Sequence, residues 1–297
     1  MNRSGVGRIS PDGLRRLHEA NAIAAIVFRQ ELLRAAVAWP ATVLEDWGVR
    51  EILNPESVWQ IGYAPDGGTT LVDRLRKAGF GRETLLLSGL ADIADDGRVV
   101  DRYRDQLVVV SYDRRLDPVA FVGIDRDGQV RPITPATPVH RQSEALVGVL
   151  EQIDLLEGGA TPVILDHPLD AAALEIASHT GSEGYVGIPQ CGLPISRAQA
   201  SMLRQYAVSD WAIVIVPAEL AASQRALRSA VELAADFERV RLITSPSGPL
   251  LANPEQLDFL ADLSFETREL DRQDSPVHDG DAETTSGLES DDQTLSP

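Results

Sequence analysis

The sequence predicts an α+β N-terminal half followed by an α/β domain with a mainly parallel sheet. From Pro162 onward, short apolar runs alternate with stretches whose apolar residues recur at helical spacing, which is typical of strands and helices taking turns in a parallel sheet. Before that point, helical patterns precede two apolar runs joined by the turn DRRLD, which indicates an antiparallel pair. The chain therefore divides into two halves of different architecture.

The first half is expected to open with a flexible lead over residues 1–13, which holds three glycines and a proline. One long amphipathic helix, or two helices, are predicted over residues 14–38, and a shorter helix over residues 70–78. Strands are predicted at residues 106–112 and 118–124, on either side of the DRRLD turn. We place the N-terminal domain at residues 14–155.

The second domain is placed at residues 156–265. Its expected strands are PVIL, GYVGI, WAIVIV and VRLIT, with helices between them. Ser196 and Gln199 form the pattern of a capping box, so a helix is expected to begin there. A last short helix is expected to open near Asn253 and to end near Leu263. Residues 266–297 are expected to be an acidic disordered tail, because they offer too little apolar surface to offset the entropy of ordering.

Composition limits the possible functions. The formal net charge is −18 over 297 residues, which argues against a simple electrostatic nucleic-acid binder, although the last 32 residues carry ten acids and two arginines. Cys191 is the single cysteine, so a cysteine-rich zinc site is excluded and a buried thiol is expected. The sequence shows no apolar run long enough to span a bilayer, and we expect a cytoplasmic protein without a membrane partner.

A series of motifs in fixed order resembles the catalytic core of bacterial DnaG-type primases. The series begins with IGYAPDG at Ile61–Gly67 and continues through ETLLLSGL, DGRVVDRYRDQLVVVSYD and TPATPVHRQSEALVGV. The resemblance spans residues 14–263, and it implies an RNA polymerase core N-terminal domain followed by a TOPRIM-like α/β domain. It also implies a link to DNA replication. The zinc-binding domain of full primases is not expected here, as the single cysteine requires.

The metal-binding acids that the resemblance implies are largely replaced. In the family, an acid after the first TOPRIM strand acts with a pair of aspartates after the third strand. Here the first position is Asp166, followed by His167 and Pro168, and the pair reads Pro217 and Glu219. Asp170 matches a further helix carboxylate. Because Mg²⁺ requires several converging oxygen ligands, the loss of one acid weakens the site.

Basic positions are also reduced. Arg102 and Arg104 match the family's arginine-rich strand entry, and Arg131 is the one cation in the stretch where the family has a lysine and an asparagine. These three arginines are the candidates for binding nucleotide or nucleic-acid phosphates.

We therefore predict a primase-core homologue with degenerate catalytic motifs that acts as a binding or interaction module. Its expected partners are single-stranded DNA or a replication protein, and the sequence leaves its oligomeric state open. One alternative is an active, divergent primase that uses Asp166, Asp170 and Glu219 as catalytic acids, with Mg²⁺ or Mn²⁺ held by Asp166 and Glu219. No cofactor is expected if activity is lost. A third possibility is an acidic regulatory protein that competes for the basic surface of a nucleic-acid-binding partner.

Overall fold

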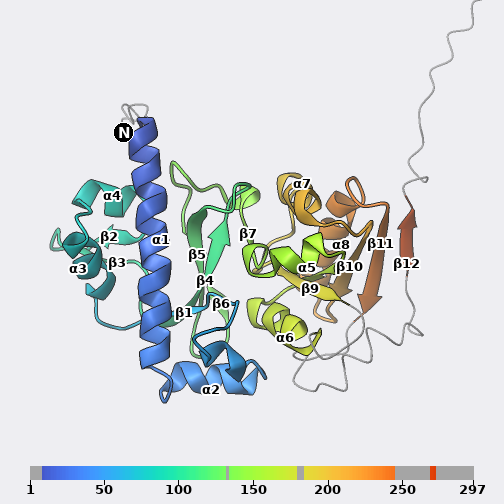
Figure 1. The fold of residues 1–297 in the computed structure, drawn as a ribbon, viewed down its shortest axis with the longest axis horizontal. Coiled ribbons are helices and arrows are strands. Elements are labelled where there is room, and N and C mark those ends of the chain that lie inside the picture. Colours follow the sequence, from blue (N-terminus) through green and yellow to red (C-terminus); the bar gives the residue numbers. More distant parts are fainter. Residues whose placement is uncertain (1–8, 132–133, 179–183, 245–267, 272–297) are drawn as a thin grey trace, which may run out of the picture.

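In the computed structural model, the chain forms two five-stranded sheets that lie side by side. One long helix packs against the first of them (Figure 1). The structure describes residues 9–131, 134–178, 184–244 and 268–271. The expected helix over residues 253–263 and most of the expected acidic tail lie outside the described residues. None of the described helices is long and apolar enough to cross a membrane.

The first half begins with helix α1 (Pro11–Arg34), whose N-cap Ser10 accepts a hydrogen bond from the backbone N–H of Gly13. The expected flexible lead is therefore too long by three residues, because this cap and Pro11 start the helix early. The other helical segments of this half are α2 (Trp39–Asp46), α3 (Thr70–Lys77), α4 (Arg82–Leu87) and 3-10 turns at Arg50–Leu53, Gln142–Glu144 and Leu150–Gln152.

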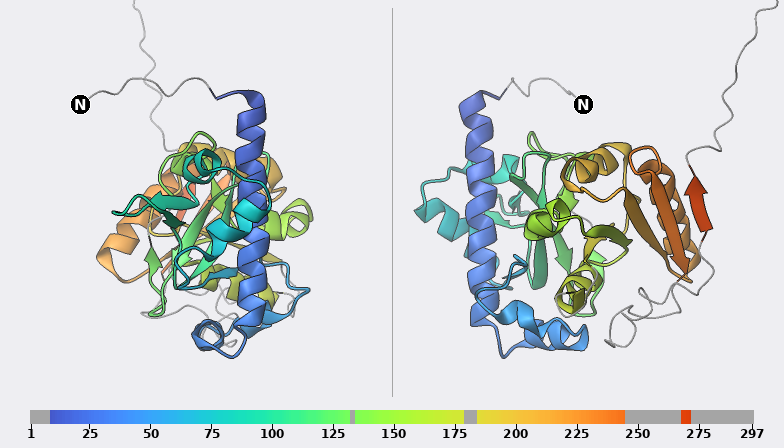
Figure 2. Two further views of the ribbon diagram at one scale, coloured as in Figure 1. Left: turned by 90° about the vertical axis from the view of Figure 1, so that its left-hand side faces the viewer. Right: turned by 45° about the vertical axis from the view of Figure 1, so that its right-hand side comes forward.

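The first sheet has the order β1-β4-β5-β6, and β7 pairs with β4. Strands β4 (Gln106–Tyr112) and β5 (Pro118–Ile124) have the predicted bounds and pair antiparallel. The remaining strands of this half are β1 (Gly62–Ala64), β6 (Val130–Arg131), β7 (Leu146–Val147) and a separate hairpin of β2 (Ala91–Ile93) and β3 (Val99–Asp101). Helix α1 covers one face of the first sheet (Figure 2).

The second sheet has the order β12-β11-β10-β8-β9, and β9, β8, β10 and β11 run parallel. These strands are β8 (Thr161–Leu165), β9 (Tyr185–Pro189), β10 (Trp211–Val216) and β11 (Arg239–Thr244). The helices of this half are α5 (Ile153–Glu157), α6 (Pro168–Ser178), α7 (Arg197–Tyr206) and α8 (Leu220–Leu233). The predicted fold class, α+β followed by a mainly parallel α/β sheet, is confirmed, and α7 has the predicted capping box.

Strand β12 (Arg268–Asp271) corrects part of the tail prediction, because these four residues pair antiparallel with β11. The physical reason lies in the sheet: β11 would otherwise be an edge strand, whose free backbone groups favour the addition of another strand.

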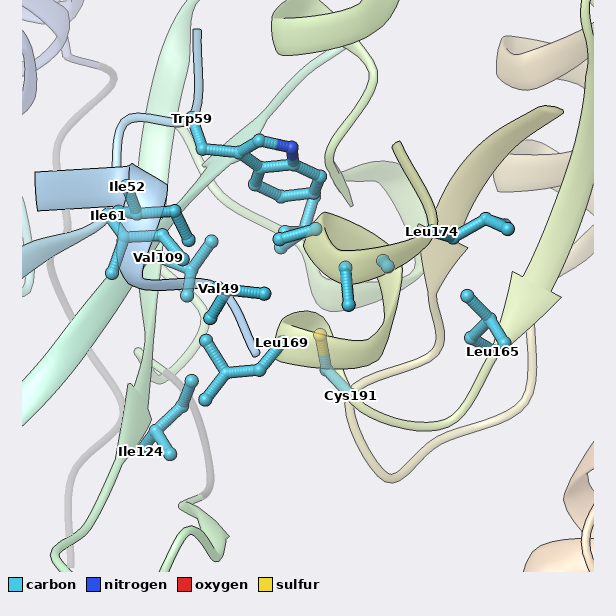
Figure 3. Close-up of a cluster of buried hydrophobic side chains, with 14 of the residues drawn as sticks. Val49, Ile52, Trp59, Ile61, Val109, Ile124, Leu165, Leu169, Leu174 and Cys191 are labelled. Atoms are coloured by element: carbon cyan, nitrogen blue, oxygen red, sulfur yellow. The ribbon is translucent and has the colours of Figure 1, made fainter. Parts of the chain in front are cut away.

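A shared core joins the two halves (Figure 3). Trp59 and Val109 of the first half belong to the same buried cluster as Leu165 and Leu169 of the second half. Cys191 also lies in this cluster, and burial raises the pKa of its thiol, so the expected buried thiol is confirmed. The common core fixes the C-terminal edge of β8 against the first sheet.

Candidate functional site

The candidate site lies at the C-terminal edge of the parallel sheet. Asp166 directly follows β8, and the turn of Pro217 to Glu219 directly follows the neighbouring strand β10. Parallel neighbours end at the same edge, which is where open α/β sheets bind their ligands. Topology thus brings these two segments to one edge, as the resemblance implies.

Asp166 is engaged by an arginine from α8. The Nη2 of Arg225 donates to Oδ2 of Asp166 at 2.9 Å, and its Nε donates to Oδ1 at 3.3 Å. Both carboxylate oxygens are therefore used, in the bidentate geometry that favours arginine–carboxylate pairs. The two side chains are only 31% and 25% exposed, so the pair is partly withdrawn from water.

Glu219 caps helix α8. Its two carboxylate oxygens accept the backbone N–H groups of Ala221 and Ala222, at 2.9 and 2.7 Å. These hydrogen bonds satisfy donors that the first turn of a helix leaves free, and they hold the pKa of Glu219 below its usual value. The side chain of Glu219 therefore has a local structural role at the position where the family carries a metal ligand.

Asp170 lies in the first turn of α6 and is 8% exposed. Within the described residues, Asp166, Asp170 and Glu219 do not form a group whose ligand atoms all lie within 4.8 Å of one another. A divalent cation such as Mg²⁺ needs oxygen ligands about 2 Å from a common centre. With Asp166 paired to an arginine and Glu219 used as a cap, this set of residues does not fit the metal that the family resemblance implies.

His167 joins the candidate site to the first half of the chain. Its ring stacks on the indole of Trp47, with centroids 4.1 Å apart and an interplanar angle of 16°. The Nδ1 atom accepts the backbone N–H of Leu169, which leaves Nε2 to donate to the carbonyl of Gly128 at 2.9 Å. Burial lowers the pKa of His167 to about 4, so the ring is neutral at physiological pH.

Two of the three predicted phosphate-binding arginines are held in local ion pairs. Arg102 pairs with Asp92 at 2.5 Å, and Arg131 pairs with Asp125. Arg104 is exposed, and no ion pair is found for it in the part of the chain that the structure describes. Because the positive charges of Arg102 and Arg131 are already balanced by aspartates, these arginines are less suited to bind a phosphate than the sequence alone suggests.

A cavity of about 680 Å³ carries a cluster of arginines that the sequence reasoning missed. Arg114 and Arg115 reach it from the β4–β5 turn, Arg141 from the segment before β7, and Arg197 from the start of α7. Asp113 and Glu144 are the acids in its lining, so arginines outnumber acids here on a strongly acidic chain. The one available signal was the Arg-Arg pair in the DRRLD turn; the other two arginines come from distant segments.

Within the described residues, a different set of side chains of metal-ligating type does lie close together. Ligand atoms of His18 on α1 and of Asp113 and Asp117 in the β4–β5 turn all lie within 4.8 Å of one another. All three residues are partly exposed, and this group lies on different elements from the candidate site at the end of β8.

Comparison with known proteins agrees with the fold and its motifs. Residues 49–152 match the family of the DNA primase catalytic core, N-terminal domain. The chain is 27% identical over 239 residues to a DNA primase of Deinococcus radiodurans, covering 79% of this chain and 39% of that protein. It is 32% identical over 129 residues to a DNA primase of Listeria monocytogenes, covering 39% of this chain and 20% of that protein. The chain thus spans well under half the length of these relatives.

Solved structures show the same fold. The RNA polymerase domain of Mycobacterium tuberculosis primase DnaG, in complex with double-stranded DNA, has a TM-score of 0.68 at 21% identity, covering 83% of this chain and 80% of that chain. A DnaG primase catalytic domain bound to single-stranded DNA has a TM-score of 0.63 at 20% identity, covering 84% and 79%. The resemblance to the DnaG-type DNA primase catalytic core is therefore confirmed: this chain is similar to that core in its fold and in its sequence motifs.

Proposed function

We propose that this chain serves DNA replication or nucleic-acid metabolism by binding single-stranded DNA, with primer synthesis impaired. The observation that carries the proposal is the engagement of the candidate acids. Asp166 forms a bidentate ion pair, and Glu219 caps a helix with both of its oxygens. Metal-dependent phosphoryl transfer needs carboxylate oxygens that are free to converge on cations. The chain therefore keeps the fold without the metal-dependent phosphoryl transfer.

The arginine-lined cavity supports the binding part of the proposal. Arg115 is exposed, and none of its side-chain atoms forms an ion pair in the described ranges. The guanidinium of Arg114 donates to a neutral partner, the hydroxyl of Ser201, at 2.9 Å, and no ion pair is found for it in the described residues. Guanidinium groups without acidic partners are suited to phosphate oxygens. Related DnaG structures are bound to DNA, which is consistent with a nucleic-acid partner.

We expect no labelled primers when the protein is incubated with single-stranded DNA, ribonucleotides and either Mg²⁺ or Mn²⁺. The reason is that Asp166 and Glu219 would have to give up their present partners before they could hold a cation. A variant with Asp166→Ala and Glu219→Ala is the control. Primers made by the wild type and lost in this variant would instead identify a divergent primase that uses these acids.

We expect replacement of Arg114 and Arg115 by glutamine to weaken binding of single-stranded DNA roughly tenfold at low salt, because two phosphate contacts are lost. The slope of log affinity against log salt should become less steep by roughly 1.4, at about 0.7 per contact on a single strand. Fluorescence anisotropy of a labelled oligonucleotide measures both quantities.

A matched control carries Arg82→Gln and Arg228→Gln, which removes the same charge from two exposed arginines outside the cavity. Equal loss of affinity in both variants would mean that net charge, and not the cavity, governs binding. If the wild type binds no DNA at low salt, the alternative of an acidic regulator of a basic partner protein is favoured.

A further inference from the structure

We propose that the guanidinium of Arg225 is the permanent counter-cation of Asp166 and closes this edge of the sheet to divalent metal. The inference deepens the proposed function and rests on it, since it gives the cause of the lost chemistry. The separate claim is that Arg225, as well as the replaced acids, keeps a divalent metal from this edge.

The geometry places the arginine at the position that a cation would need. Asp166 is the first residue after β8, and both of its carboxylate oxygens receive hydrogen bonds from Arg225. A cation bound there would have to displace these donors. It would also lie beside a fixed positive charge, which repels it. The pair with Arg225 therefore disfavours a metal ion on Asp166.

Helix α8 holds Arg225 rigidly in this position. At its start, Glu219 accepts the first free backbone N–H groups. One turn beyond Arg225, the fully buried Ser229 accepts the N–H of Ile195 at 2.8 Å and donates to Oε1 of Gln190 at 2.5 Å. The cap thus fixes the first turn of α8, and Ser229 ties the helix to the connection between β9 and α7. Arg225 therefore reaches Asp166 from a fixed backbone.

The pair also accounts for a partly buried carboxylate on a strongly acidic chain. Asp166 is 31% exposed, and a carboxylate withdrawn from water is costly unless it is paired. In a metal-dependent protein the metal supplies that charge. Here the side chain of Arg225 supplies the positive charge, so the negative charge of Asp166 is balanced without a metal.

Replacing Arg225 by glutamine should leave the carboxylate of Asp166 open to a weakly bound metal ion. We expect Mn²⁺, followed by isothermal titration calorimetry and by electron paramagnetic resonance of the free ion, to bind Arg225→Gln at least about tenfold more tightly than wild type, since the competing cation is removed. Adding Asp166→Asn to Arg225→Gln should abolish the gain. The control Arg228→Gln, an exposed arginine on the same helix, should leave Mn²⁺ binding at the wild-type level.

Two outcomes would overturn the inference. One is tight Mn²⁺ binding by the wild type that depends on Asp166. The other is no gain in Arg225→Gln while its circular dichroism and thermal midpoint show a folded protein. The primer-synthesis assay separates this failure from that of the proposed function. Wild-type primers refute impaired catalysis, whereas an unresponsive Arg225→Gln variant refutes only the role of the arginine.

Discussion

Replacement of Gly187 by alanine is expected to lower the free energy of unfolding by about 3 kcal/mol, at the upper end of overpacking costs. Gly187 lies in β9, beneath the first turn of α6. A Cβ at this position would lie 2.5 Å from both the Cα and the carbonyl oxygen of Ala171. These are backbone atoms, so a rotamer change cannot relieve the clash, and α6 must move away from the sheet.

The same glycine also holds the junction between the two halves. The side-chain amide of Gln152 donates to the carbonyl of Gly187 at 2.9 Å and accepts its N–H at 3.2 Å. Displacement of β9 would strain these buried hydrogen bonds as well. Chemical denaturation of Gly187→Ala and wild type measures the effect.

Gly81→Ala is the matched control, because nothing lies within 4 Å of a Cβ added at Gly81. We expect that change to stay within about 1 kcal/mol of the wild type. A Gly187→Ala protein as stable as this control would show that α6 tolerates a shift on β9, and the packing argument would be wrong.

The periodic elements of the fold were accessible from sequence. Strands β4 and β5 have the predicted bounds because their apolar runs end at clear turn residues, and the capping box predicted the start of α7. Strand β12 was missed because its pairing depends on the edge of β11 and not on its own composition. Local patterns predict local structure, and edge pairing is not local.

The candidate site shows the same limit. The resemblance located Asp166 and Glu219, and topology brings their segments to one sheet edge. The partner of Asp166 is Arg225, which lies 59 residues further along the chain and has no sequence signature. The cavity arginines likewise come from separate segments. Motif spacing identifies which groups are present, whereas the groups that neutralise or surround them depend on the tertiary fold.

Acidification is expected to destabilise the protein through His167. The pKa of this residue is about 4 in the folded chain and about 6.5 in the unfolded chain. Between these values the unfolded chain binds a proton that the folded chain does not, so the stability is fully present above about pH 6.5 and is lost as the pH falls toward 4. The loss from this group amounts to about 3 kcal/mol.

The physical cause lies in the surroundings of the ring. The imidazole is buried against Trp47, and its Nδ1 accepts the N–H of Leu169, so a proton on Nδ1 would replace an acceptor by a second donor facing that N–H. Protonation must therefore break the hydrogen bond from Leu169 in α6, and it places a positive charge on a ring that is withdrawn from water. Because the same ring also contacts Trp47 and Gly128 of the first half, we expect the loss to appear as global unfolding.

Other buried groups also titrate, so the test is a difference between variants. Burial lowers the pKa of His140, which also makes the protein less stable as the pH falls. Burial raises the pKa of Glu151 to about 7, which has the opposite effect on stability. Denaturation curves from pH 4 to 8 for wild type, His167→Gln and His140→Gln separate the contributions of the two histidines. If His167 carries the effect, His167→Gln is less stable than wild type at pH 7 and the difference narrows toward pH 4; parallel curves would exclude it.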